Sequence, residues 1–134
     1  MSAERAIYEI LSTDGGVSQL VGKRIYPITI DQGAGLPAIA YQQISGPREH
    51  NVSGAIGWVQ SRYQITVWAA TYIEAVDLAT AVRLAVDGLS GTKASLVIDH
   101  IFVVDEGDVS DLFAENTELN IYGKRIDAQI VFKE

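Results

Sequence analysis

Residues 58–87, with the sequence WVQSRYQITVWAATYIEAVDLATAVRLAVD, decide the fold because a strand pattern is followed at once by a helix pattern. Apolar and polar residues alternate from 58 to 70, which is the period of a β-strand with one buried face. The apolar face consists of Val59, Tyr63, Ile65, Val67 and Ala69. We therefore expect one side of this strand to pack on the hydrophobic core.

The other face of this strand is polar except near its ends, where Trp58 and Trp68 lie. Its polar residues are Gln60, Arg62, Gln64 and Thr66. The two tryptophans belong either to a second covered face or rim cluster, or to a contact with another subunit. The second interpretation rests on the enrichment of tryptophan at the hot spots of protein interfaces.

Residues 72–87 have the pattern of an amphipathic helix that packs one face on a sheet. Thr71 is suited to the N-cap position, and Glu74 at the third helical position completes a capping box. The expected apolar stripe consists of Tyr72, Val76, Ala79, Val82 and Val86. Gly88 follows, and a glycine just beyond the last helical turn commonly ends a helix.

The remaining sequence predicts one more main helix and four further strands. The helix covers residues 3–11 with Ser2 as its N-cap, and a short turn follows at 17–21. The strands are expected at 24–26, 37–44, 95–104 and 120–132. Long loops are expected at 45–57 and, with acidic residues and at most a short helical turn, at 105–118. We predict one domain over 1–134 with an α+β fold. Because hairpin-like loops join most strands, the sheet should be mostly antiparallel. Two main helices should pack on one face of it, as a two-layer α/β sandwich.

The composition limits the chemistry of the chain. There are no cysteines, which excludes disulfides, thiolate zinc sites and cysteine nucleophiles. The formal net charge of -7 disfavours avid binding to nucleic acid; it serves solubility, or lets DNA pass nearby without adhering. The longest apolar runs are too short to span a bilayer, and residues 1–20 lack a signal-peptide pattern.

Neither histidine predicts a catalytic site. His50 follows Glu49 in the 45–57 loop, where a general base is conceivable, but no nucleophile-elbow sequence accompanies it. An ordinary polar loop is therefore the favoured interpretation. His100 follows Asp99 inside an expected strand, and there we expect a hydrogen-bonded structural histidine.

The acidic residues of 105–118 do not predict a metal site. They are Asp105, Glu106, Asp108, Asp111, Glu115 and Glu118. Calcium needs several oxygen ligands, but this spacing lacks the fixed glycine and terminal glutamate of an EF-hand loop. The glycine-containing turns at 14–16 and 33–35 also lack the lysine and hydroxyl residue of a phosphate loop. We therefore assign no catalytic, cofactor-binding or metal-binding residue, and we expect no enzyme.

Three short motifs occur in a characteristic order along the chain: RIYP at 24–27, LPAIAYQ at 36–42 and WAATY-x-EA at 68–75. Together with the closing strand up to Phe132, they make the sequence resemble the tail-completion proteins of long-tailed bacteriophages and prophages. The resemblance extends over nearly the whole chain. The segment 105–118 is the part least typical of that family.

The resemblance implies a structural protein of the virion tail, assembled in the host cytoplasm and positioned at the tail-head junction. Such proteins are similar to tail terminators, which form a ring, usually hexameric, that ends the tail tube and joins it to the head connector. The implied partners are sister copies, the tail tube protein and the head connector or head-completion protein, with DNA passing through without specific binding. No cofactor and no membrane are implied. The candidate interface residues are Trp58, Trp68, Arg48, Glu49, His50 and Arg62.

Two alternatives stay open from the sequence. A neck or head-completion adaptor belongs to the same broad class but has another location. A small hydrolase or ligand-binding domain that uses the His50 loop belongs to a different class, and it requires a concave pocket near His50.

Overall fold

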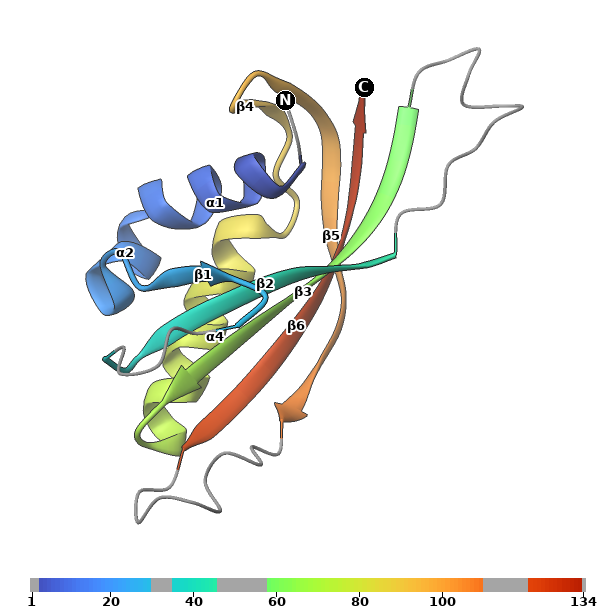
Figure 1. Cartoon of the computed structure of the whole chain (residues 1–134). Helices are drawn as coiled ribbons and strands as arrows, with labels where there is room; N and C mark the ends of the chain where they lie inside the picture. The colour runs from blue at the N-terminus through green and yellow to red at the C-terminus, as the bar shows by residue number, and fades with distance from the viewer. Residues whose placement is uncertain (1–2, 30–34, 46–57, 110–120, 134) are drawn as a thin grey trace.

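The computed structural model describes residues 3–29, 35–45, 58–109 and 121–133. It contains α-helices, and strands of a single sheet, within these ranges (Figure 1). The helices are α1 (Ala3–Thr13), α2 (Gly15–Val21) and α4 (Tyr72–Val86). The strands are β1 (Ile25–Pro27), β2 (Ala38–Ser45), β3 (Trp58–Ala69), β4 (Gly91–Lys93), β5 (Leu96–Val109) and β6 (Tyr122–Lys133). None of the helices in this part of the chain has the length and apolar character needed to cross a membrane.

The strands lie in the order β1-β2-β3-β6-β5-β4. All neighbouring pairs are antiparallel except β1 and β2, which are parallel, so the sheet is mixed but mostly antiparallel. β3 and β6 are paired along their whole length, from Trp58 opposite Lys133 to Ala69 opposite Tyr122. The predicted α+β class with a mostly antiparallel sheet is thus confirmed.

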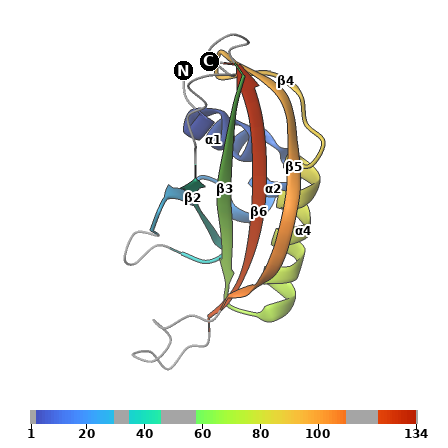
Figure 2. The same ribbon diagram turned by 90° about the vertical axis from the view of Figure 1, so that its right-hand side faces the viewer.

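The described helices lie on one side of a strongly curled sheet (Figures 1 and 2). The apolar face predicted for β3 is confirmed, because Tyr63, Ile65, Val67 and Ala69 are buried and Val59 packs against the core. β6 presents Ile126, Ala128, Ile130 and Phe132 to the same core. Two features differ from the predicted arrangement. The sheet is curled, and α2 is a third helix where only a short turn was expected. The two-layer sandwich is therefore not confirmed.

Helix α4 begins as its sequence predicts. The Thr71 side chain accepts a hydrogen bond from the Glu74 backbone N–H at 3.2 Å, which satisfies a donor at the start of the helix. The expected apolar stripe is partly wrong, because Tyr72 is exposed and Val76 is only half-buried. The buried residues are Ala75, Leu78, Ala79, Val82 and Val86. The helix is therefore rotated so that Ala75 and Leu78, in place of Tyr72 and Val76, belong to its buried side.

The segment 105–109 is not a loop, which corrects the expectation for 105–118. β5 continues to Val109, and Asp105 to Val109 pair with Asp127 to Gly123 of β6. Acidic residues are tolerated in this strand because cations of β6 neutralise two of them: Asp105 bonds Arg125 and Asp108 bonds Lys124. Residues 110–118 of the expected loop lie outside the described residues.

The outer edge of β5 is partly closed by the chain that leaves α4. The Gly88 N–H donates to the Ile101 carbonyl at 2.8 Å, and the Ile101 N–H donates to the Leu89 carbonyl at 3.1 Å. The Asp87 carboxylate accepts from the Val103 N–H at 2.9 Å. These bonds fix the end of α4 to the sheet and satisfy backbone groups that an edge strand otherwise leaves unpaired.

Two leucines of α4 give a matched test of this packing. Leu78 is 0% exposed and Leu84 is 71% exposed on the same helix. We expect Leu78→Ala to lower the free energy of unfolding by about 2–5 kcal/mol, because it leaves a cavity in the core. Leu84→Ala is expected to stay within about 0.5 kcal/mol of the parent. Urea unfolding measures both, and equal losses would contradict the assigned rotation of α4.

An open sheet face as candidate interaction surface

The side of the sheet away from the helices is here called the open face. It consists of alternate residues of β3 from Gln60 to Trp68 and of β6 from Gly123 to Lys133, together with the β2 and β5 residues beside them. Figure 2 shows that no described helix covers this side of the strands. Because side chains alternate along a strand, burying one face on the helices leaves all of these side chains on the other.

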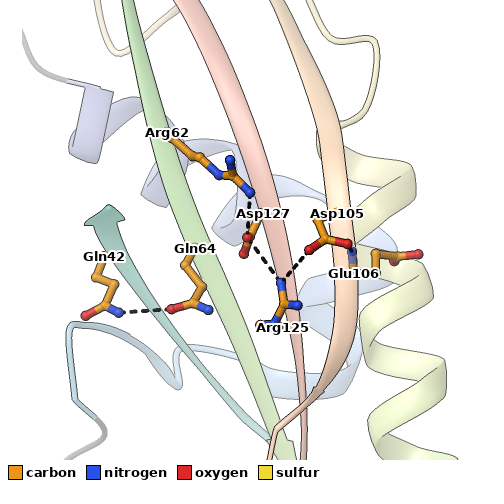
Figure 3. A network of polar contacts seen from close by, with 7 residues as sticks. All are labelled: Gln42, Arg62, Gln64, Asp105, Glu106, Arg125 and Asp127. Atoms are coloured by element: carbon orange, nitrogen blue, oxygen red, sulfur yellow. Dashed lines mark hydrogen bonds and ion pairs between the residues drawn. The ribbon is translucent and has the colours of Figure 1, made fainter. Parts of the chain in front are cut away.

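A chain of ion pairs crosses the open face from β3 to β5 (Figure 3). Asp127 of β6 accepts from Arg62 at 3.0 Å and from Arg125 at 3.1 Å, and Arg125 also bonds Asp105 at 3.1 Å. Asp127 is buried although it lies on this polar face, since the two guanidinium groups flank it. A carboxylate bonded by two cations forms charge-assisted hydrogen bonds, which are stronger than neutral ones.

This ion-pair chain is not fully satisfied. Among the residues that the structure describes, Asp127 Oδ1 and Arg62 Nε are buried and have no hydrogen-bond partner. Buried polar atoms usually find partners, so each unpaired one lowers stability. We therefore do not interpret the ion-pair chain as a source of net stability. Its role is better explained as holding Arg62 and Arg125 in fixed positions on the open face.

Amide pairs extend the polar centre of the open face to the neighbouring strands. Gln42 of β2 donates to Gln64 at 3.0 Å, and Gln129 of β6 donates to Gln60 at 2.9 Å. Each pair crosses between adjacent strands, in the way that cross-strand contacts stabilise a sheet. The centre of the open face is consequently a preformed polar surface that its own hydrogen bonds hold in place.

Trp68 forms the apolar end of this surface, as its position in the strand pattern predicts. Its ring lies over Gly123 of β6, and a Cβ atom at Gly123 would come within 2.4 Å of a ring carbon. Gly123 is thus required by the close approach of the ring, and sequence reasoning did not find this role. Trp58 lies opposite Lys133 at the start of β3.

The remaining predicted interface residues are only partly placed. Arg62 lies on the open face with 42% of its side chain exposed. Arg48, Glu49 and His50 fall in 46–57, outside the described residues, as does the side chain of Trp58. The structure therefore brings Trp68 and Arg62 onto one face and leaves the contribution of the loop as a prediction.

An apolar strip on β5 was not predicted as part of a site. Val97 and Phe102 are both exposed, and the His100 ring packs on Phe102 with ring centres 4.2 Å apart. His100 Nδ1 lies 2.6 Å from an Asp99 carboxylate oxygen, which confirms the expected hydrogen-bonded histidine. The apolar sequence of 95–104 predicted a strand. It did not indicate which face of that strand the helices leave uncovered.

The carboxylates of β5 serve as ion-pair partners. Hydrogen bonding from Arg125, followed by its charge, lowers the pKa of Asp105, and the Lys124 hydrogen bond lowers the pKa of Asp108. Lys124 also lies 5.6 Å from the centre of the Tyr72 ring. Within the described ranges, no group of three or more His, Cys, Asp or Glu residues is arranged to hold a metal ion.

The described fold defines a class: an α+β protein whose mostly antiparallel sheet has helices on one face and no described helix on the other. The family model of tail completion protein gp17 matches residues 5–118. The chain belongs to this tail-completion family of phage structural proteins, which confirms the resemblance noted in the sequence.

A solved structure has the same fold. A chain from the "Virion of native gene transfer agent (GTA) particle" aligns with a TM-score of 0.74 at 16% sequence identity. The alignment covers 99% of this chain and 96% of that chain. At this identity the likeness establishes a shared fold. A search of curated protein sequences finds no match.

The contact between Trp68 and Gly123 predicts energetic coupling. We expect Gly123→Ala to lower the free energy of unfolding by about 1–3 kcal/mol, because the new methyl overlaps the indole ring. In a Trp68→Ala background the same change should be close to neutral, so a double-mutant cycle should give a coupling of similar size. Gly15→Ala is the control, since nothing lies within 4 Å of a Cβ atom placed there. Additive effects in the cycle would contradict the stacking of the ring.

The ion pair between Asp105 and Arg125 predicts a pH dependence. The pKa of Asp105 is lowered in the folded state, so the pair stabilises the protein above the ordinary Asp value of 3.8 and is lost as the pH falls through the lowered value. Asp105→Asn should therefore be less stable than the parent at pH 6, and the difference should shrink below pH 3.8. Urea unfolding across this range measures it, and a constant difference would show that the charge is not responsible.

Proposed function

We propose that this chain is a tail terminator that forms a ring of sister copies, usually a hexamer, at the end of the tail tube. The ring ends tube polymerisation and joins the tail to the head connector, at the tail-head junction of a virion assembled in the host cytoplasm. Membership of the tail-completion family is the observation that carries this proposal. The chain acts here as one domain over 1–134 and as a structural protein without catalysis or cofactor.

The open face supports the proposal physically. A closed ring needs two different contact surfaces on each copy, because its contacts run head to tail. The open face offers one such surface, on which Trp68 and Arg62 are both half-buried. In this proposal Trp58 and the loop residues Arg48, Glu49 and His50 extend that contact.

The acidic composition suits a ring through which DNA passes without specific binding. The net charge of -7 repels phosphate groups, so a DNA duplex near the ring is not retained. The proposed partners are therefore all proteins: sister copies, the tail tube protein, and the head connector or head-completion protein.

The length of the tails tests the proposed function. Virions made without this chain should carry tails of uncontrolled, excessive length that are not joined to heads, because nothing ends tube growth. Electron microscopy of such particles, with the parent gene restored as the control, measures the length distribution. Tails of normal length that are not joined to heads would contradict a terminator and indicate a neck or head-completion adaptor instead.

A further inference from the structure

The outer edge of β5 is formed by backbone groups that point away from β6. In an antiparallel pair, every second residue directs both its N–H and its C=O away from the partner strand. Ile101 is such a residue, because its two groups bond the chain that leaves α4. It lies opposite Ile130, and Val103, Glu106 and Asp108 also lie opposite even-numbered residues of β6. These four residues of β5 therefore present their backbone groups at the edge of the sheet.

Two carboxylates occupy N–H groups of this edge. Asp87, the residue that follows α4, accepts from the Val103 N–H at 2.9 Å through Oδ1. Asp105 accepts from the Glu106 N–H at 3.0 Å, also through Oδ1. With the bond of the Ile101 N–H at 3.1 Å, three of the four outward donors are in use. A strand that added to this edge would first have to displace these acceptors.

Both carboxylates are held in place by contacts outside the edge. Asp105 uses its second oxygen, Oδ2, to bond Arg125 at 3.1 Å, and Arg125 also bonds Asp127 (Figure 3). The ion-pair chain of the open face thus ends at the edge and orients a side chain there. Asp87 is fixed by its own backbone, since its N–H donates to the Arg83 carbonyl at 2.9 Å as the cap of α4.

The opposite edge of the sheet is closed by other means. β1 directs the Arg24 carbonyl and the Ile28 N–H toward β2, so the groups of Ile25 and Pro27 point outward. The Ile25 N–H donates to the carbonyl two residues earlier at 2.8 Å, and Pro27 has no N–H. The Pro27 carbonyl accepts from the N–H two residues later at 2.7 Å. Proline and charged residues are the usual means of keeping edge strands from pairing.

We propose that Asp87 and Asp105 are edge caps, which keep β5 from pairing with the β5 strand of a second copy. Their carboxylates bond the outward N–H groups that such a strand would need. Without them, the segment from Val103 to Asp108 pairs with its equivalent in another copy, and the two sheets become continuous. Copies of this chain therefore contact one another through side chains and not through this backbone edge. This inference does not depend on the proposed ring.

Hydrogen exchange of single amides, followed by NMR, tests each cap. Asp87→Ala should accelerate exchange at the Val103 amide by about tenfold or more, because that N–H loses its acceptor. Asp105→Ala should do the same at the Glu106 amide. Asp87→Asn and Asp105→Asn are the matched controls, since each keeps an acceptor oxygen and should leave its amide near the parent rate. Equal acceleration at buried Ile65 would indicate a general loss of stability and would overturn the local caps.

Self-association tests what the caps prevent. The Asp87→Ala Asp105→Ala double variant should show one association step beyond those of the parent in sedimentation velocity, because its edge accepts a second copy. In the associated species, the amides of Val103 and Glu106 should exchange slowly again. The Asp87→Asn Asp105→Asn variant loses the same two charges and should behave as the parent does.

Three results would overturn the proposal. Equal association of the asparagine variant would show that charge, and not the bonded oxygen, keeps the copies apart. Association that leaves the Val103 and Glu106 amides in fast exchange would place the contact elsewhere. A double alanine variant that associates no more than the parent would show that the edge needs no cap.

Discussion

The burial of alternate residues of β3 and β6 against the helices is the constraint on which the rest of the structure depends. Because β3 and β6 are paired along their whole length, the same alternation fixes both faces of the sheet at once. Every residue between the buried ones is thereby placed on the open face. A shift of one position in the register would move Arg62, Trp68 and Asp127 into the core, where the unpaired charges would be costly.

The sequence predicted those elements whose local signals agree with their tertiary packing. The strand at 58–69 and the helix capped by Thr71 were found because periodicity, cap and boundaries all agree. The strand β4 was missed because its hairpin turn uses Ala94 and Ser95 at positive φ, where Asn-Gly is the usual signal. The end of β5 was missed because its carboxylates suggested a loop, and their partners Lys124 and Arg125 are distant in sequence.

The candidate surface was predictable only in part, for the same physical reason. Period-two alternation placed Trp68 and Arg62 on the polar side of β3, and the structure agrees. The ion-pair chain centred on Asp127 depends on contacts between strands that local patterns do not encode. Likewise, a β-bulge in β5 decides that Val97 and Phe102 share a face, and simple alternation places them apart. Family membership then gives this surface its significance, since a tail-completion protein works by contacting other chains.

The central claim is that other protein chains cover the open face in the virion. Hydroxyl-radical footprinting followed by mass spectrometry measures it most directly, because the aromatic side chains of Trp68 and Phe102 react readily when they are accessible. The account predicts that both residues are labelled in the free chain and are protected several-fold in assembled particles, while Tyr8 on α1 changes little. Equal labelling of Trp68 and Phe102 in the free chain and in the particle would contradict it.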